Sequence, residues 1–159
     1  MKKVNFLFII LLLSTLYVNA QSNILSVIEK GQSKQLVNWL SEGHDVNTPL
    51  LYKSETMSLL SLASKLGQAE IADILIKKGA NVKARIEFKD ALMFAAEGGN
   101  KEIVNMLIQA GADFTLENMK GQTAKDLALN AGHSEVATIL DQEMQNKYKA
   151  IRLAKANKK

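Results

Sequence analysis

The chain has 159 residues, of which 47% are hydrophobic, 23% charged and 6% aromatic, and its formal net charge is +4. This balance is typical of a globular chain and excludes a disordered or membrane-filling one. The sequence has no cysteine, which excludes a disulfide framework, a Cys-type zinc finger, thiol catalysis and an anchor on a lipid-modified cysteine.

Residues 1–20 have the pattern of a secretory signal peptide. Lysines at positions 2 and 3 precede an apolar run from Phe6 to Leu13, and Val18-Asn19-Ala20 suits a cleavage site. Polar residues interrupt the run, whereas a membrane-spanning helix needs roughly 18 uninterrupted apolar residues. We therefore expect the mature chain to begin at Gln21. We expect it to carry no membrane anchor and to be either periplasmic or secreted from a bacterium.

The positive charge is concentrated at the C-terminal end. Six basic and no acidic side chains lie from Lys147 onward, whereas residues 21–146 carry 12 basic and 16 acidic side chains, a formal charge of −4. The basic end includes a single aromatic residue, Tyr148. Because the basic region is so confined, we expect no nucleic acid among the partners.

Glycines recur along the chain with a period near 33 residues. Pairs twelve residues apart are Gly31 and Gly43, Gly67 and Gly79, and Gly99 and Gly111, and Gly132 opens a fourth segment. Between the glycines, apolar residues such as Ile71, Ile74 and Leu75 recur at spacings of three and one, which indicates one apolar stripe on a short helix. Such helices do not fold alone, so the pattern predicts units that stack to share a core.

The segments upstream of the opening glycines are also alike. They read SLLSLAS from Ser58, DALMFAA from Asp90 and TAKDLAL from Thr123, and the closing glycines are followed by Ala-Asn-Val and Ala-Asp-Phe. From about Ser22 to Met144 this pattern resembles the ankyrin repeat. It departs from the family in lacking the usual histidine, and Leu59, Ala91 and Ala124 replace the usual proline.

The resemblance implies an all-α ankyrin-repeat solenoid of about four helix-turn-helix units with projecting turns. The units would span about residues 22–47, 48–80, 81–112 and 113–144, within a domain of residues 21–146. Polar residues stand at core positions in the end units alone, with Gln35 and Asn38 in the first and Asp141 in the last. This placement predicts capping repeats, whose outer faces meet water.

Residues 147–159 are predicted to be a basic, helical tail. Leu140, Met144, Tyr148 and Ile151 follow one another at helical spacings, so we expect one amphipathic helix that packs against the last repeat with its basic side outward. This interpretation favours a solvated cap over contact with an anionic partner or a membrane surface.

The sequence shows no constellation of residues for catalysis. His44 and His133 fall in loops of the first and fourth units, and layers of about 10 Å each would hold them too far apart to share a metal. Glu70, Glu102 and Glu135 recur near the starts of second helices, where negative charge stabilises the helix dipole. We expect no enzymatic activity, no cofactor and no metal.

The resemblance implies binding of another protein through the inter-repeat turns and the concave side lined by the first helices. We expect the chain itself to be a monomer. The turns carry residue types that are enriched at protein interfaces, although Leu50, Ile86 and Leu116 could instead fold back over the helices. The candidate partner-binding residues are Leu51, Tyr52, Lys53, Arg85, Glu87, Phe88, Lys89, Met119, Lys120 and Gln122.

Three alternatives stay open at this point. The chain could be a protective or regulatory companion of a specific exported enzyme or toxin, which the resemblance to small exported bacterial ankyrin proteins allows. It could associate with the cell envelope through its basic tail. A hydrolase that depends on His133 is the third alternative.

Overall fold

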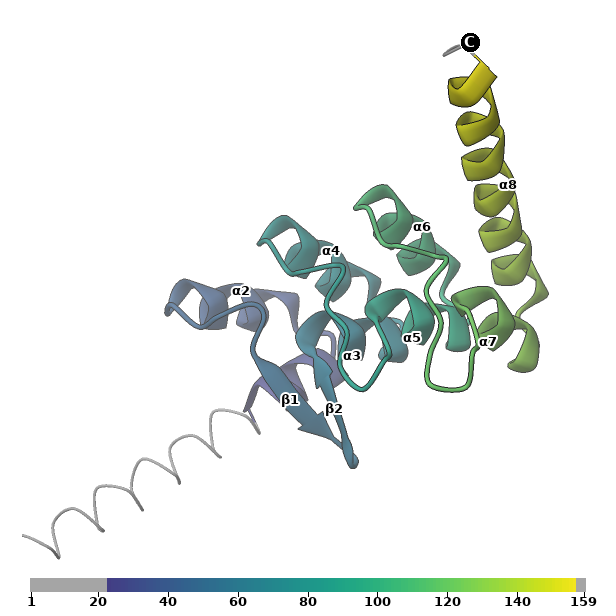
Figure 1. Cartoon of the computed structure of the whole chain (residues 1–159). Helices are drawn as coiled ribbons and strands as arrows, with labels where there is room; N and C mark the ends of the chain where they lie inside the picture. The colour runs from purple at the N-terminus through teal and green to yellow at the C-terminus, as the bar shows by residue number, and fades with distance from the viewer. Residues whose placement is uncertain (1–22, 157–159) are drawn as a thin grey trace, which may run out of the picture.

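The computed structural model describes residues 23–156 of the chain, and the predicted signal peptide lies outside them. Figure 1 shows helix pairs stacked side by side, with one row of first helices and one row of second helices. The pairs are residues 23–29 with α2 (Ser33–Ser41), α3 (Leu59–Leu66) with α4 (Ala69–Lys77), α5 (Ala91–Glu97) with α6 (Lys101–Gln109), and α7 (Ala124–Asn130) with α8 (Ser134–Ala156). The predicted all-α solenoid is confirmed.

Three of the first helices begin at side chains that cap them. The side chains of Ser58, Asp90 and Thr123 accept hydrogen bonds from backbone N–H groups three residues on, at the starts of α3, α5 and α7. Each bond satisfies a donor that the helix itself leaves unpaired. The caps therefore form without the family's proline and histidine.

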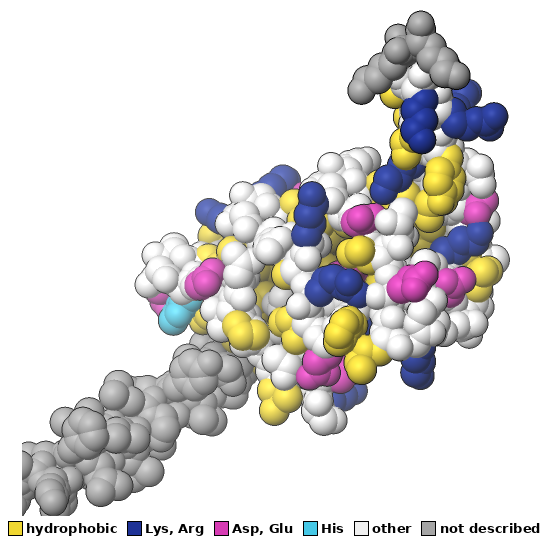
Figure 2. Space-filling model, viewed as in Figure 1, with side chains coloured by type: hydrophobic (Ala, Val, Ile, Leu, Met, Phe, Trp, Pro, Cys, Tyr) yellow, Lys and Arg dark blue, Asp and Glu magenta, His cyan; other side chains and the backbone are white. Residues whose placement is uncertain are grey.

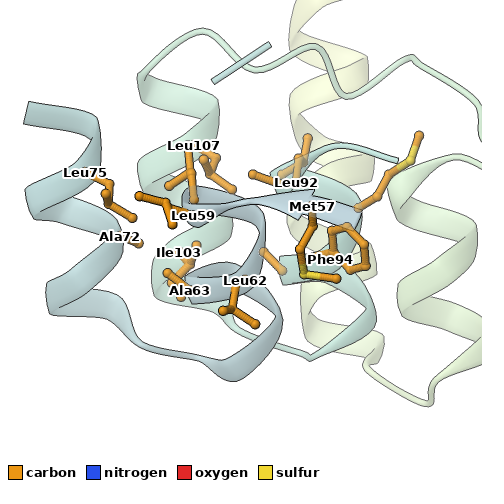
Figure 3. Packing of buried hydrophobic residues seen from close by; sticks show 14 of the residues in the cluster. Met57, Leu59, Leu62, Ala63, Ala72, Leu75, Leu92, Phe94, Ile103 and Leu107 are labelled. Carbon is orange, nitrogen blue, oxygen red and sulfur yellow. The ribbon is translucent and has the colours of Figure 1, made fainter. Parts of the chain in front are cut away.

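The core runs continuously through the stack. Residues 59–64 of α3 and 91–96 of α5 are buried on all sides because helices flank them, whereas the last first-row helix, α7, buries three residues. In Figure 3, Leu59 and Ala63 face Leu75 of α4 and Ile103 of α6. The described core extends from Ile24 to Leu140, so a chain that begins at Gln21 retains all of it.

The turns between the two helices of a unit form a ladder along the stack. The amide of Gln68 donates to the Glu29 carbonyl at 3.0 Å, and Asn100 donates to the Ser64 carbonyl at 2.9 Å. His133 holds the same place in the fourth unit, against Gly99, where an added Cβ would lie 2.5 Å from its Nδ1. This packing gives His133 a structural role.

Both ends of the stack are capped as expected. Gln35 and Asn38 are exposed on α2. At the other end, Asp141 of α8 forms an ion pair with Lys125 of α7. The polar residues at core positions therefore meet water or, in the case of Asp141, pair with a lysine of the neighbouring helix.

The last helix differs from its expected packing. α8 continues without a break past residue 147, and Lys147 lies 3.6 Å from the Asp113 carboxylate and 5.1 Å from the centre of the Phe114 ring. Beyond that contact, Tyr148 is 55% exposed and Ile151 42% exposed. The prediction that these two residues pack on the last repeat was wrong, because α8 is longer than the layer beneath it and extends past the stack (Figure 1).

The first inter-repeat turn forms a β-hairpin that the sequence did not reveal. Strands β1 (Pro49–Tyr52) and β2 (Glu55–Ser58) pair in antiparallel register, with Pro49 opposite Ser58 and Tyr52 opposite Glu55.

Among residues 23–156, no helix combines the length and the apolar character needed to cross a bilayer.

Candidate functional site

Three loops project from one side of the stack, and each carries a large exposed apolar side chain. They comprise residues 47–57, 83–89 and 115–121, and Figure 1 shows the segments leaving the helices in the same direction. Leu51 is 62% exposed, Phe88 57% and Met119 75%. Figure 2 shows hydrophobic, basic and acidic side chains mixed along this edge. We call these three residues the loop tips.

Short polar side chains fix the start of each loop. The side chains of Asp45, Asn81 and Asp113 each accept a hydrogen bond from the backbone N–H two residues on, at 2.9 to 3.0 Å. Asn47 also accepts from the Asn81 N–H at 2.8 Å, which joins the first loop to the second. These Asx turns set the direction of the loops before any partner binds.

The first loop divides its candidate residues between two faces. Along β1, side chains alternate, so Leu50 and Tyr52 point inward and are buried while Leu51 points outward. Tyr52 was predicted to contact a partner, but its side chain is only 7% exposed and does not form part of an open surface. Lys53, at the hairpin turn, is exposed, and its ammonium lies 5.2 Å from the centre of the Tyr52 ring.

The second loop is held by Arg85. Its guanidinium donates to the carbonyl of Phe88 at 2.9 Å and to that of Glu117 in the third loop at 2.5 Å. It also lies 5.9 Å from the centre of the Phe88 ring. Arg85 was predicted to contact a partner, and in the structure its hydrogen bonds tie two loops together.

The turn of the second loop has an unfavourable backbone conformation for its residues. Glu87 and Phe88 have φ values of +52° and +63°, between Ile86 and Lys89, which pair with each other. Asn-Gly is the usual choice for two successive residues at positive φ. A phenylalanine at such a position is a candidate for function, because the fold alone would favour glycine.

A network of charges connects the first and second loops to the helices. Lys89 lies 3.7 Å from Glu55 of the hairpin and 3.6 Å from Glu97 of α5, and Lys65 of α3 also pairs with Glu55. The hydrogen bond from Lys65 holds the pKa of Glu55 below its ordinary value. Both lysines lie about 5 Å from the Phe94 ring centre. The charge of Lys89, a predicted partner residue, is therefore already paired.

Leu50 is buried, and Ile86 and Leu116 are half-buried. These three residues cover the helices, which resolves the alternative left open by the sequence. The loop tips and the charged residues beside them remain outside.

A groove of about 550 Å³ lies between the second and third loops and the ends of α5 and α7. Five predicted residues line it: Glu87, Lys89, Met119, Lys120 and Gln122. Sequence reasoning did not single out the others, which are Glu97, Asn118, Leu127, Asn130 and Ala131. Glu97 and Asn130 stand two residues before an opening glycine, as Lys65 does, so the repeat register could have identified them.

The groove is lined by amide, charged and apolar side chains. Asn130 offers an amide group and Met119 offers apolar contact, while the amide of Asn118 donates to that of Gln122 at 3.2 Å and Leu127 is buried beneath. Asn118 also accepts hydrogen bonds from the N–H groups of Lys120 and Gln122, which orders the third loop. Within residues 23–156, no three His, Asp or Glu side chains gather closely enough to hold a metal ion.

The family described as "Ankyrin repeats (3 copies)" matches residues 23–118 and, in a second overlapping match, residues 60–150. The chain belongs to the ankyrin-repeat family. Ankyrin repeats generally mediate protein–protein interaction and are typically non-catalytic.

Relatives share the repeats within longer proteins. Ankyrin repeat and SAM domain-containing protein 6 of Rattus norvegicus is 36% identical over 110 residues, which are 67% of this chain and 12% of that protein. An ankyrin repeat-containing protein of Treponema pallidum is 37% identical over 92 residues, 57% of this chain and 31% of the relative. The NAD-capped RNA hydrolase NUDT12 of Homo sapiens is 42% identical over 50 residues, 31% of this chain and 11% of the enzyme. This ankyrin-repeat chain thus matches under a third of the length of each of these relatives.

Proposed function

We propose that this ankyrin-repeat chain is an exported, monomeric module that binds another protein through the loop tips and the adjacent groove, without catalysis or cofactor. The observation that carries the proposal is the exposure of one large apolar side chain on each of three neighbouring loops, at Leu51, Phe88 and Met119. The stack does not need these side chains for its own core.

Two physical arguments support this surface. A few large apolar anchors carry most of the binding free energy of a typical interface. The Asx turns and the Arg85 hydrogen bonds already order the loops, so binding would lose less conformational entropy than the ordering of free loops requires.

The test is a cross-linking capture with the chain that begins at Gln21. In one variant the loop tips are replaced together, as Leu51→Ser, Phe88→Ser and Met119→Ser. The control replaces exposed apolar residues outside both proposed surfaces, as Val37→Ser and Leu129→Ser. The proposal expects the first variant to lose the captured partner and the control to keep it, with both melting near the parent temperature. Equal capture by both variants would show that another surface binds.

The identity of the captured protein tests the finer form of the proposal. A single stoichiometric complex with one exported enzyme or toxin would show the chain to be a companion of that protein. A range of partners without fixed stoichiometry would exclude that role.

Export is supported by the leader pattern in residues 1–20. The measurement is the N-terminal sequence of the chain recovered from the periplasmic or secreted fraction. The proposal expects it to begin at Gln21, and an intact N-terminus would contradict cleavage.

A further inference from the structure

The free end of α8 is a second surface that protein binding at the loops does not use. We call residues 145–156 the basic arm. Near its start, Lys147 approaches Asp113 and Phe114, and Ala150 borders the same part of the repeats. From Tyr148 to Ala156 every residue is exposed, and Figure 1 shows the arm leaving the stack on the side away from the hairpin.

One face of the arm combines positive charge with apolar side chains. Gln145, Tyr148, Lys149, Arg152, Leu153 and Ala156 line a shallow depression along it. Tyr148 and Leu153 are 55% and 57% exposed, and Lys149 and Arg152 lie between them in the sequence. No acidic residue follows Glu143 in the chain.

We propose that the basic arm binds the anionic headgroups of a phospholipid bilayer. Lysine and arginine near such a surface are attracted by its negative potential, and tyrosine and leucine can enter the boundary between headgroups and acyl chains. The long stems of Lys149 and Arg152 let their charges reach phosphate while the apolar groups lie deeper.

The charge distribution sets how the chain would approach such a surface. Residues 21–146 carry a formal charge of −4, so an anionic bilayer repels the stack and attracts the arm. The loop tips, on the other side of the stack, stay open to a partner. The two surfaces can therefore be occupied at the same time.

A bilayer suits the arm better than a partner with a defined pocket. A single helix that extends past the repeats offers only a shallow depression and cannot enclose a compact ligand. The side chains of Lys149, Arg152 and Lys155 form no ion pair within residues 23–156, so no carboxylate of the described chain fixes the positions of their charges. A lipid surface requires no such pattern.

The test is sedimentation of the Gln21 chain with vesicles of phosphatidylcholine alone or with about 30 mol% phosphatidylglycerol. The proposal expects binding to the anionic vesicles, little to the neutral ones, and weakening with salt because the attraction is screened. Lys149→Gln with Arg152→Gln should reduce the partition coefficient about tenfold or more.

The matched control is Lys34→Gln with Lys78→Gln, which removes the same charge from exposed positions on the stack. It should bind within about twofold of the parent, since those lysines do not face the bilayer. A second variant, Tyr148→Ser with Leu153→Ser, should also bind more weakly. Equal binding to both vesicles, no binding, or no effect of Lys149→Gln with Arg152→Gln would overturn the proposal. Tighter binding to soluble polyglutamate than to vesicles would overturn it in favour of an acidic polypeptide.

Discussion

The helical stack and the projecting loops use apolar side chains in opposite ways. In the stack, residues such as Leu62 and Leu107 are fully buried. The helix ends there suit their residues, as in α3, which begins at the capping side chain of Ser58 and ends at Gly67 with a positive φ. In the loops, Leu51, Phe88 and Met119 are exposed, and the backbone of Phe88 has a positive φ, which is unfavourable for a residue with a large side chain. The difference separates residues that the fold needs from residues that are free to bind.

The largest expected effect contrasts the same substitution in the two regions. Leu62→Ala should lower the free energy of unfolding by about 3 kcal/mol, because it leaves a cavity between helices. Leu51→Ala should change it by about 0.5 kcal/mol or less, since that side chain already meets water. Urea titrations of both variants measure the difference. Similar losses would mean that the hairpin belongs to the core.

The glycines in the turns of the stack offer a more local test of its packing. Gly99→Ala should lower the free energy of unfolding by about 2 kcal/mol, because φ is +70° and the new Cβ would meet His133. Gly111→Ala, at φ +90° with open space around it, should cost about 1 kcal/mol from backbone strain alone.

A double-mutant cycle isolates the steric part of this effect. In a chain that already carries His133→Ala, Gly99→Ala should lower the free energy of unfolding by about as much as Gly111→Ala does in the parent. If the two single losses simply add, His133 does not pack on Gly99 as the structure shows.

Glycine substitutions in the loops should change the stability in opposite directions. Phe88→Gly should raise the free energy of unfolding by about 0.5 kcal/mol, because glycine adopts positive φ without strain. Met119→Gly should lower it by about 0.5 kcal/mol, since glycine adds freedom to the unfolded chain. Thermal melts of the two variants reveal the signs. A loss at Phe88 would mean that its contact with Arg85 outweighs the strain.

The smallest expected effect is a dependence on pH at two caps. Burial raises the pKa of Asp90, so the folded chain holds this proton more tightly than the unfolded chain. Above the raised pKa of Asp90 the carboxylate is ionised in the folded chain, and its burial lowers the free energy of unfolding. As the pH falls through that pKa, Asp90 takes up a proton and the free energy of unfolding rises again. Asp90→Asn, which keeps a capping side chain, should remove this dependence.

Asp126 provides the opposite sign. The Thr123 hydroxyl lowers its pKa, so its contribution is present above the ordinary carboxyl pKa and is lost as the pH falls through the lowered value. Unfolding titrations of Asp90→Asn and Asp126→Asn across the acidic range should therefore diverge from the parent in opposite directions. Parallel profiles would contradict the assigned burial of Asp90.

The stack was predictable from the sequence because its signals are local and repeated. The period of the glycines and the stripe that includes Ile71 and Leu75 recur in successive units, and each unit supports the same interpretation. The capping of the ends followed from Gln35, Asn38 and Asp141 for the same reason.

The loops and the arm were less predictable because tertiary geometry decides them. The hairpin turns at Lys53 and Ser54, and both have positive φ without the Asn-Gly that would indicate such a turn. The burial of Tyr52 depends on that hairpin. The exposure of Tyr148 and Ile151 depends on where the layer beneath α8 ends, which the helical spacing of these residues does not contain.

The measurement that tests the central claim most directly is amide hydrogen exchange of the chain alone and with its captured partner. The account predicts added protection in the three loops and at the ends of α5 and α7 that border the groove, with no change in α4 and α6. Protection confined to α4, α6 or the basic arm would contradict the claim that the loops bind the partner.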